Sequence, residues 1–350
     1  MRYSTFGRRT GLRVSEFALG TANFGTGWGS GANTAESKRM LDRYAEAGGN
    51  FLDTAENYQA GESEKFLGDL LRADREHFVL ASKFGFGAEA DPGISGTGNS
   101  RRKMVRAVEA SLERLQTDYL DLYWVHAPDS VTPTEEIVRG FDDLVRAGKI
   151  LHGGLSNFPA WRVARAATIT ELRGIAPLVG VQAEYSLAER TAERDLLPMA
   201  EGLGLGVVLY SPLAGGLLTG KYRSGAEGRL TTWKSVIHVE DDAQKVSVVD
   251  TLLKVAADLG RPPAEVATAW VRERGRRAAT TVLPIIGPRT VGQLDSYLAA
   301  LDLELSDQQY RELDEVSAVR GGVPHDIVTQ TADALLGGHG ADFDRPAPVA

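Results

Sequence analysis

Residues 50–58 read NFLDTAENY, and this stretch decides the fold because it joins an apolar strand to a loop with polar side chains. Asp53 ends the apolar run, and Tyr58 follows in the loop. Two later runs have the same form, since Lys83 ends FVLASK and His126 ends YLDLYWVH. In a parallel β/α barrel, the carboxyl ends of the strands and the loops after them meet on one rim, where active sites form. We therefore expect these four side chains to share one site.

The rest of the chain alternates between apolar runs and amphipathic helical stretches. Thr34 and Ser100 are expected helix N-caps, and Pro133 and Gly148 mark the start and the stop of another helix. Eight strands in alternation with helices predict a parallel α/β sheet that is either closed or doubly wound. The expected strands cover residues 16–20, 51–53, 78–82, 120–126, 150–156, 179–182, 206–210 and 281–286, after a hairpin within residues 3–15.

Two observations favour the closed form, a (β/α)8 TIM barrel. The candidate site residues come from many strand ends rather than from one switch point. The glycine-rich stretches at residues 25–31 and 202–206 lack the spacing or the place of a dinucleotide-binding G-x-G-x-x-G turn. We expect one domain over residues 1–350, with a long loop after the seventh strand, at residues 212–243. A tail at about residues 320–350 is expected to cover the barrel mouth.

Composition excludes several classes of protein. The 350 residues are 43% hydrophobic and 25% charged, with a net charge of −8, and basic residues do not form a stripe of the kind that binds nucleic acid. There are no cysteines, which excludes disulfides, zinc–thiolate sites and a thiol nucleophile. We see neither a secretory signal nor an apolar stretch of membrane-spanning length, and expect a cytoplasmic protein without membrane or nucleic-acid partners.

The four residues at the predicted rim have complementary acid–base chemistry. A phenol is a weak acid, and a neighbouring ammonium such as that of Lys83 stabilises its phenolate. Lys83 in turn needs a counter-ion if it is buried, and Asp53 can supply one. His126 can donate to a carbonyl oxygen or share the proton of Tyr58. The group therefore suits protonation of an alkoxide rather than nucleophilic attack. Taken singly, each residue is more often a turn former, a packing group or a surface charge, so the prediction depends on their joint placement.

These motifs resemble the aldo-keto reductase family, from Tyr3 to about Ser317. The resemblance is closest to bacterial oxidoreductases that are similar to potassium-channel β-subunits. It implies a (β/α)8 barrel that binds extended NADPH, reduces a small-molecule carbonyl substrate, and uses Asp53, Tyr58, Lys83 and His126 as its catalytic tetrad. The matching segments are GLRVSEFALGTANFG, NFLDTAENYQAGESE, ASKFG, DLYWVHAPD, GKILHGGLSNF, VQAEYSL, YSPLAGGLLTGKY and IIGPRTVGQL.

The resemblance also implies a set of cofactor-binding residues. A tyrosine stacks on the nicotinamide in this family, and Tyr210 is the first choice here, with Tyr185 as the rival. Residues 212–221 would form a belt over the cofactor, in which Lys221 adds positive charge. The implied residues at the nicotinamide and pyrophosphate are Gly20, Thr21, Ala22, Asp53, Ser156, Asn157, Gln182, Tyr210, Ser211, Leu213, Gly215, Leu217 and Lys221.

At the adenosine end, the segment GPRT precedes a predicted helix, whose amino end favours a phosphate. The resemblance assigns Gly287, Arg289 and Gln293 to this end, and Arg289 can grip a 2′-phosphate, which favours NADPH over NADH. The family often has Glu-Asn where this chain has Ser296 and Tyr297. This departure leaves the adenine contacts and the strictness of NADPH preference open.

Substrate choice is less defined by the sequence. Phe24, Trp28 and Phe86 lie in loops after strands and are expected to line an aromatic opening. The leading hypothesis is an NADPH-dependent carbonyl reductase, and some relatives act on nucleotide-activated deoxysugars or natural-product ketones. A redox-sensing regulatory subunit that binds NADPH is the alternative. A metal-dependent hydrolase ranks below both, because clustered ligands are lacking and no metal is expected. The sequence leaves open whether the protein forms a homo-oligomer.

Overall fold

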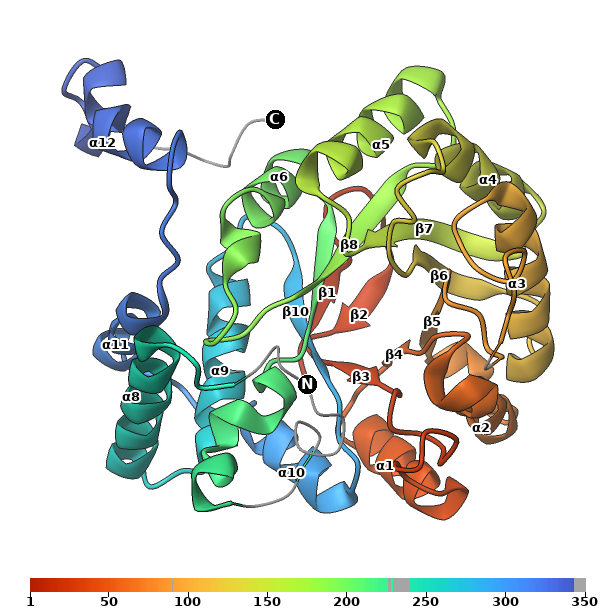
Figure 1. Ribbon diagram of the computed structural model, residues 1–350, viewed down its shortest axis with the longest axis horizontal. Helices are drawn as coiled ribbons and strands as arrows, with labels where there is room; N and C mark the ends of the chain where they lie inside the picture. Colours follow the sequence, from red (N-terminus) through yellow and green to blue (C-terminus); the bar gives the residue numbers. More distant parts are fainter. Residues whose placement is uncertain (90, 226–227, 229–238, 343–350) are drawn as a thin grey trace.

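The structure is a computed structural model that describes residues 1–89, 91–225, 228 and 239–342 (Figure 1). At its centre, eight parallel strands close into a barrel, which confirms the predicted (β/α)8 fold with its amino-terminal hairpin. The order around the barrel is β10-β3-β4-β5-β6-β7-β8-β9. The strands are β3 (Ala18–Gly20), β4 (Phe51–Asp53), β5 (Val79–Phe84), β6 (Leu120–Val125), β7 (Ile150–Ser156), β8 (Leu178–Glu184), β9 (Gly206–Tyr210) and β10 (Val282–Ile286).

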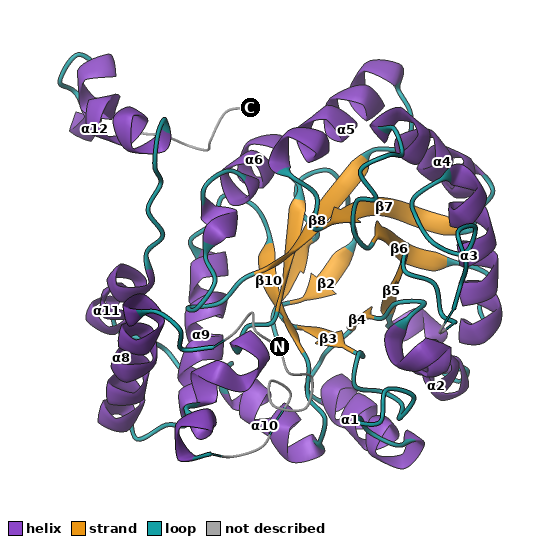
Figure 2. Cartoon of the chain, in the orientation of Figure 1, coloured by secondary structure: helices purple, strands orange, loops and turns teal. Residues whose placement is uncertain are grey.

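Helices surround the barrel as an outer layer (Figure 2). Each forms because one face is apolar; in α4, Ile137, Phe141 and Leu144 recur at helical spacing and are buried. The surrounding helices are α1 (Thr34–Glu46), α2 (Glu62–Leu71), α3 (Arg101–Leu115), α4 (Thr134–Arg146), α5 (Ala160–Arg173), α6 (Leu196–Leu203), α9 (Pro263–Arg276) and α10 (Val291–Ala299). Short 3-10 turns η1 (Tyr58–Gly61), η2 (Arg75–His77) and η3 (Thr191–Glu193) lie in the connections.

The predicted helix starts are right at Ser100 and wrong at Thr34. The Ser100 side chain accepts from the backbone of Lys103, as an N-cap does. Helix α1 is capped one residue earlier than predicted, by Asn33, which has an extended backbone and accepts from Glu36 N. Asparagine is as good a cap as threonine, and here its backbone has the required conformation.

The amino end of the barrel is closed by apolar packing. Strands β1 (Tyr3–Thr5) and β2 (Arg13–Ser15) form an antiparallel hairpin, and Phe6 inserts from it into the barrel. The Phe6 ring packs edge-on against Phe51 and Trp124, at centroid distances of 5.8 and 6.2 Å. Because the amino end is filled in this way, the carboxyl ends of the strands are left to form the site.

A pair of helices lies outside this layer, next to α9. Helices α8 (Ala243–Leu259) and α11 (Asp307–Ser317) pack together beside α9 (Figure 1). The long segment after β9 begins with η4 (Ala214–Thr219) and η5 (Lys221–Ser224). The rest of the predicted 212–243 loop falls partly on residues 226–227 and 229–238, which lie outside the described residues.

The tail follows α11 and carries α12 (His325–Leu335) and η6 (Gly340–Asp342). Figure 1 shows α12 outside the layer of helices, and His325 Nε2 lies 3.0 Å from Asp195 Oδ1 at the start of α6. The described part of the predicted tail therefore leaves the centre of the barrel uncovered, and residues 343–350 lie outside the described residues. Within the described ranges, no helix combines the length and the apolar character needed to cross a membrane.

Candidate active site

Three of the four predicted catalytic side chains meet at the carboxyl end of the barrel. Lys83, fully buried on β5, donates from Nζ to the Tyr58 hydroxyl at 3.0 Å and to the Thr54 carbonyl at 2.8 Å. The same ammonium is paired with the buried carboxylate of Asp53. The other oxygen of Asp53 accepts from Gln182 Nε2 at 2.9 Å. The carboxylate, the ammonium and the phenol thus form one hydrogen-bonded chain.

The charge of Lys83 is set by its neighbours. Burial by itself would lower the pKa of the ammonium, but Asp53 and Tyr58 outweigh this effect, and the pKa lies above its ordinary value. The neighbours of Lys83 therefore favour the charged form of its side chain. Since the site excludes bulk water around this group, its attraction for negative charge on the Tyr58 oxygen is little screened.

His126 directly follows β6 and completes the group. Burial, and then the like charge of Lys83, lower the pKa of His126 from 6.5 to about 3, so the ring is neutral. The ring packs edge-on against Tyr58, at a centroid distance of 5.8 Å. Its Nδ1 is buried and has no hydrogen-bond partner within the described residues. A neutral imidazole keeps one N–H donor, which suits it to hold a carbonyl oxygen without contributing charge.

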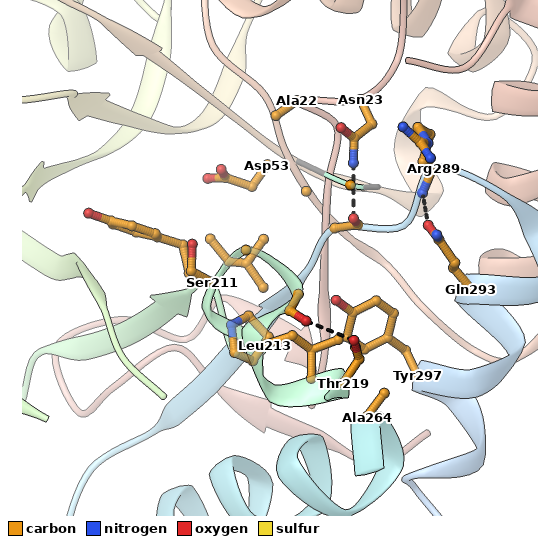
Figure 3. A pocket seen from close by; sticks show the side chains of 18 of the residues that line it. Ala22, Asn23, Asp53, Ser211, Leu213, Thr219, Ala264, Arg289, Gln293 and Tyr297 are labelled. Atoms are coloured by element: carbon orange, nitrogen blue, oxygen red, sulfur yellow. Dashed lines mark hydrogen bonds between the residues drawn. The ribbon is translucent and has the colours of Figure 1, made fainter. Parts of the chain in front are cut away.

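A cavity of about 440 Å³ extends from this group to the start of α10 (Figure 3). Asp53 and Ser211 lie toward one end in Figure 3, and Arg289 and Gln293 toward the other. The predicted residues on its wall are Gly20, Ala22, Asp53, Tyr58, His126, Asn157, Gln182, Tyr210, Ser211, Leu213, Gly215, Lys221, Gly287, Arg289 and Gln293. The wall also contains Asn23, Ser30, Pro212, Gly216, Thr219, Gly228, Ala264, Ile285, Ser296 and Tyr297.

Some predicted residues lie behind the wall instead. The Thr21 hydroxyl contacts the Ser63 hydroxyl at 2.8 Å, and Ser156 is buried and contacts Asn157 Nδ2 at 3.2 Å. The Leu217 side chain is part of the apolar core. These three side chains lie behind the cavity wall and do not face the cavity. Lys83 is also absent from the wall, and it is linked to the cavity by its hydrogen bond to Tyr58.

At the catalytic end, the structure distinguishes the two candidate tyrosines. Tyr210 lies on the cavity wall and donates from its hydroxyl to Asn157 Oδ1 at 2.7 Å. Tyr185 is fully buried and stacks on Trp270 at 5.9 Å, away from the opening. Asn157 and Ser211 have positive φ angles of 60° and 58°. Such strain in residues other than glycine is typical of positions whose side chains or amides are held for function.

At the far end of the cavity, hydrogen bonds fix the residues around the start of α10. The N-cap Thr290 accepts from Gln293 N, and Gln293 Oε1 accepts from Arg289 N at 2.8 Å. Asn23 Nδ2 donates to the Gly287 carbonyl at 3.0 Å and so fixes the segment before the helix to the first loop of the barrel. Sequence reasoning missed Asn23, although it directly follows the predicted Gly20–Ala22 segment.

Two aromatic rings flank the phenol and the imidazole at the opening. Trp28 packs edge-on against Tyr58 at 6.0 Å, and Phe86 packs edge-on against His126 at 4.8 Å. Both are exposed, by 37% and 51%. Phe24 is fully buried in the core, so the structure does not bring this third predicted residue to the opening. The Phe24 backbone pairs with that of Ala32 within the same loop, and its ring packs into the apolar core.

Comparison with known proteins agrees with the fold. The profile of the aldo/keto reductase family matches residues 16–318. Among relatives, an uncharacterised oxidoreductase YrpG of Bacillus subtilis is 39% identical, over 92% of this chain and 98% of the relative. Norsolorinic acid reductase of Aspergillus flavus is 34% identical, over 92% of this chain and 82% of the relative. Aryl-alcohol dehydrogenase [NADP(+)] of Phanerodontia chrysosporium is 33% identical, over 95% of this chain and 88% of the relative.

The chain belongs to the aldo-keto reductase family, which confirms the predicted resemblance. It is therefore an oxidoreductase whose family chemistry is the interconversion of carbonyl and alcohol groups. No group of three or more His, Cys, Asp or Glu side chains in the described ranges could hold a metal ion.

Proposed function

We propose that this protein reduces aldehydes or ketones to alcohols with NADPH, and that Tyr58 delivers the proton. The observation that carries the proposal is the contact of 3.0 Å between Lys83 Nζ and the Tyr58 hydroxyl, made by an ammonium that Asp53 keeps charged. The hydroxyl lies on the cavity wall, where a substrate can reach it.

The residues of the chain have distinct roles in this reaction. Bound NADPH would supply the hydride that reaches the carbonyl carbon. His126, neutral at working pH, donates to the carbonyl oxygen and orients it toward Tyr58. Tyr58 gives its proton to that oxygen as negative charge develops there, and Lys83 stabilises the phenolate that is left. Asp53 and Gln182 hold Lys83 in place, and the phenolate regains a proton from water once the alcohol has left.

The cavity suits an extended dinucleotide phosphate. Near the tetrad, the side-chain oxygens of Asn157 and Gln182 can accept from the N–H groups of a carboxamide, and the Tyr210 ring offers an aromatic face. Along the middle, Gly215 and Gly216 have positive φ angles, which bring the backbone close to a ligand, and Lys221 is positively charged. Close backbone amides and a lysine suit a pyrophosphate, and residues 212–221 would form a belt over the cofactor.

The adenosine end favours NADPH over NADH. Arg289 is exposed on the cavity wall, next to the amino end of α10. A cation at this end of a helix opposes the helix dipole, but a bound phosphate would be stabilised by both. Ser296 and Tyr297 lie on the same wall and are the proposed neighbours of the adenine. A relative named for NADP(+) supports the same cofactor.

The substrate is proposed to be an aromatic aldehyde or ketone. Trp28 packs against the proton donor Tyr58, Phe86 packs against His126, and both rings present exposed aromatic surface to the opening. Stacked or edge-to-face ring contacts of this kind are each worth about 0.5–1.5 kcal/mol. A relative named for aryl alcohols supports the same class.

The test is Tyr58→Phe, followed by the decrease of NADPH absorbance with an aromatic aldehyde. Because only the hydroxyl is removed, we expect the NADPH dissociation constant to be unchanged, while turnover falls by about 10²–10⁴-fold. Turnover equal to that of the unchanged protein would refute the role of Tyr58. Tight NADPH retention with no reduction of any carbonyl by the unchanged protein would instead support the regulatory alternative.

A further inference from the structure

The segment that carries Tyr58 also holds the loop that carries Phe86. Glu56, two residues before Tyr58, accepts with one oxygen from Gly85 N at 2.7 Å and from Gly87 N at 2.9 Å. These two amides flank Phe86, whose ring packs against His126. A single carboxylate oxygen thus fixes the backbone on both sides of this aromatic side chain.

Glu56 is buried and has its own counter-ion. Its second oxygen accepts from Lys103 Nζ on α3 at 2.7 Å, and the two side chains are 3% and 9% exposed. A buried ion pair often adds little stability compared with apolar side chains of the same size, but a lone buried charge is costly. Replacing Glu56 by an apolar residue would leave two loop amides and one ammonium without an acceptor. The pair is therefore better explained by the position it gives the loop than by overall stability.

On the other side of Tyr58, a second set of contacts holds the loop that carries Trp28. Gln59 is buried and accepts from Trp28 N at 2.9 Å, while its amide donates to the Ala22 carbonyl at 2.8 Å. Glu62 accepts from Thr26 N at 2.7 Å and from Gly27 N at 3.0 Å.

The Trp28 loop also lies in direct contact with the Tyr58 turn. A Cβ atom added to Gly27 would lie 2.4 Å from the Gln59 carbonyl oxygen. Gln59 itself has a φ of 51°, a conformation that costs free energy in a residue other than glycine. Both facts indicate that the spacing between this loop and the proton donor is closely determined.

We propose that Glu56, Gln59 and Glu62 are positioning residues for specificity: from residues 56–62, the segment that includes Tyr58, they set the distance and direction of Phe86 and Trp28 across the opening. This inference rests on the proposed carbonyl reduction and adds the residues that determine which carbonyl compounds are accepted. A flat aromatic substrate contacts both rings, so its binding depends on their positions. A small aliphatic aldehyde reaches Tyr58 without them and depends on them little.

The primary experiment compares Glu56→Ala with Asp121→Ala as a matched control. Asp121 is also a buried carboxylate that accepts from one backbone amide, that of Leu80, and from one cation, that of Arg75. It lies at the start of β6, at the opposite end of the barrel. Both variants should therefore lose stability, but only Glu56→Ala should release the Phe86 loop.

The first measurement does not need turnover. Hydrogen exchange of the backbone amides in residues 84–89 should become about 10-fold faster or more in Glu56→Ala, because the loop loses its hydrogen bonds to a charged carboxylate. It should be unchanged in Asp121→Ala. Equal protection in both variants would overturn the inference, whatever the fate of the proposed function.

The second measurement uses the proposed reaction. For Glu56→Ala, we expect the KM for benzaldehyde to rise about 3- to 10-fold relative to that for propanal, the range given by one aromatic contact. The NADPH dissociation constant should stay unchanged. Glu56→Gln, which keeps an acceptor oxygen, should restore part of the discrimination. Equal loss for both aldehydes would show a structural role only and would overturn the inference.

A separate variant tests the other loop if Glu56→Ala does not fold. Gly27→Ala removes no charge and no hydrogen-bonding group, but its Cβ collides with the Gln59 backbone and must displace the Trp28 loop. Its expected effect is the same shift of preference from benzaldehyde toward propanal, with NADPH binding retained. An unchanged ratio of the two KM values would contradict the role given to the Trp28 loop. Absence of reduction by the unchanged protein would count against the proposed function, and the exchange measurement would still decide the positioning role.

Discussion

Removing the Lys83 charge should separate the structural role of the ion pair from its catalytic role. In Lys83→Met, a side chain of similar length replaces a fully buried ammonium, and the buried carboxylate of Asp53 loses its counter-ion. Breaking a buried pair from one side costs about 3–5 kcal/mol of unfolding free energy, because a lone charge remains. The Thr54 carbonyl also loses its donor, which adds about 1 kcal/mol.

The double variant Asp53→Asn/Lys83→Met removes both charges and should recover most of this loss. Turnover should not recover, since the Tyr58 phenolate has no neighbouring cation in either variant. Urea unfolding followed by circular dichroism gives the free energies, and NADPH absorbance with benzaldehyde gives the turnover. The reasoning is refuted if the double variant is no more stable than Lys83→Met, or if Lys83→Met retains the turnover of the unchanged protein.

Two further predictions concern pH and cofactor choice. Because the pKa of His126 is about 3 in the folded protein and near 6.5 when unfolded, the folded state binds fewer protons between these values. The free energy of unfolding should therefore fall as the pH drops from about 6.5 to 3, by about 4 kcal/mol more than in His126→Gln. Urea unfolding at pH 7 and at pH 4.5 would detect the start of this difference between the two proteins. Parallel pH dependence in the two proteins would contradict the assignment. Arg289→Ala should raise the KM for NADPH about 10- to 100-fold and leave that for NADH unchanged; equal changes for both cofactors would contradict the 2′-phosphate contact.

The strand-end pattern was sufficient to predict the barrel and the convergence of the tetrad. The alternation of short apolar runs with helices has few topological solutions, and in a parallel barrel the ends of β4, β5 and β6 have to be neighbours. The Lys83 contacts with Asp53 and Tyr58 follow from that adjacency. Residues at strand ends are therefore predictable before any coordinates are known.

Loop residues were harder to predict, because no periodic pattern records which way they turn. Phe24 and Trp28 are four residues apart in one loop, yet the first is in the core and the second at the opening. Ala264 reaches the cavity from the start of α9, and its side chain carries no chemical signal. Glu56 lies inside the motif that identified the site, but its contacts with Gly85 and Gly87 appear only in three dimensions.

The central claim is that a charged lysine and a neutral histidine present one phenolic proton to a carbonyl oxygen. A crystal structure of the protein with NADP+ and an aromatic carboxamide inhibitor tests it most directly. We predict that the inhibitor oxygen lies within hydrogen-bonding distance of both the Tyr58 hydroxyl and a His126 ring nitrogen, with the nicotinamide against Tyr210. An inhibitor oxygen bound away from Tyr58, or a nicotinamide outside the cavity between Asp53 and Arg289, would contradict it.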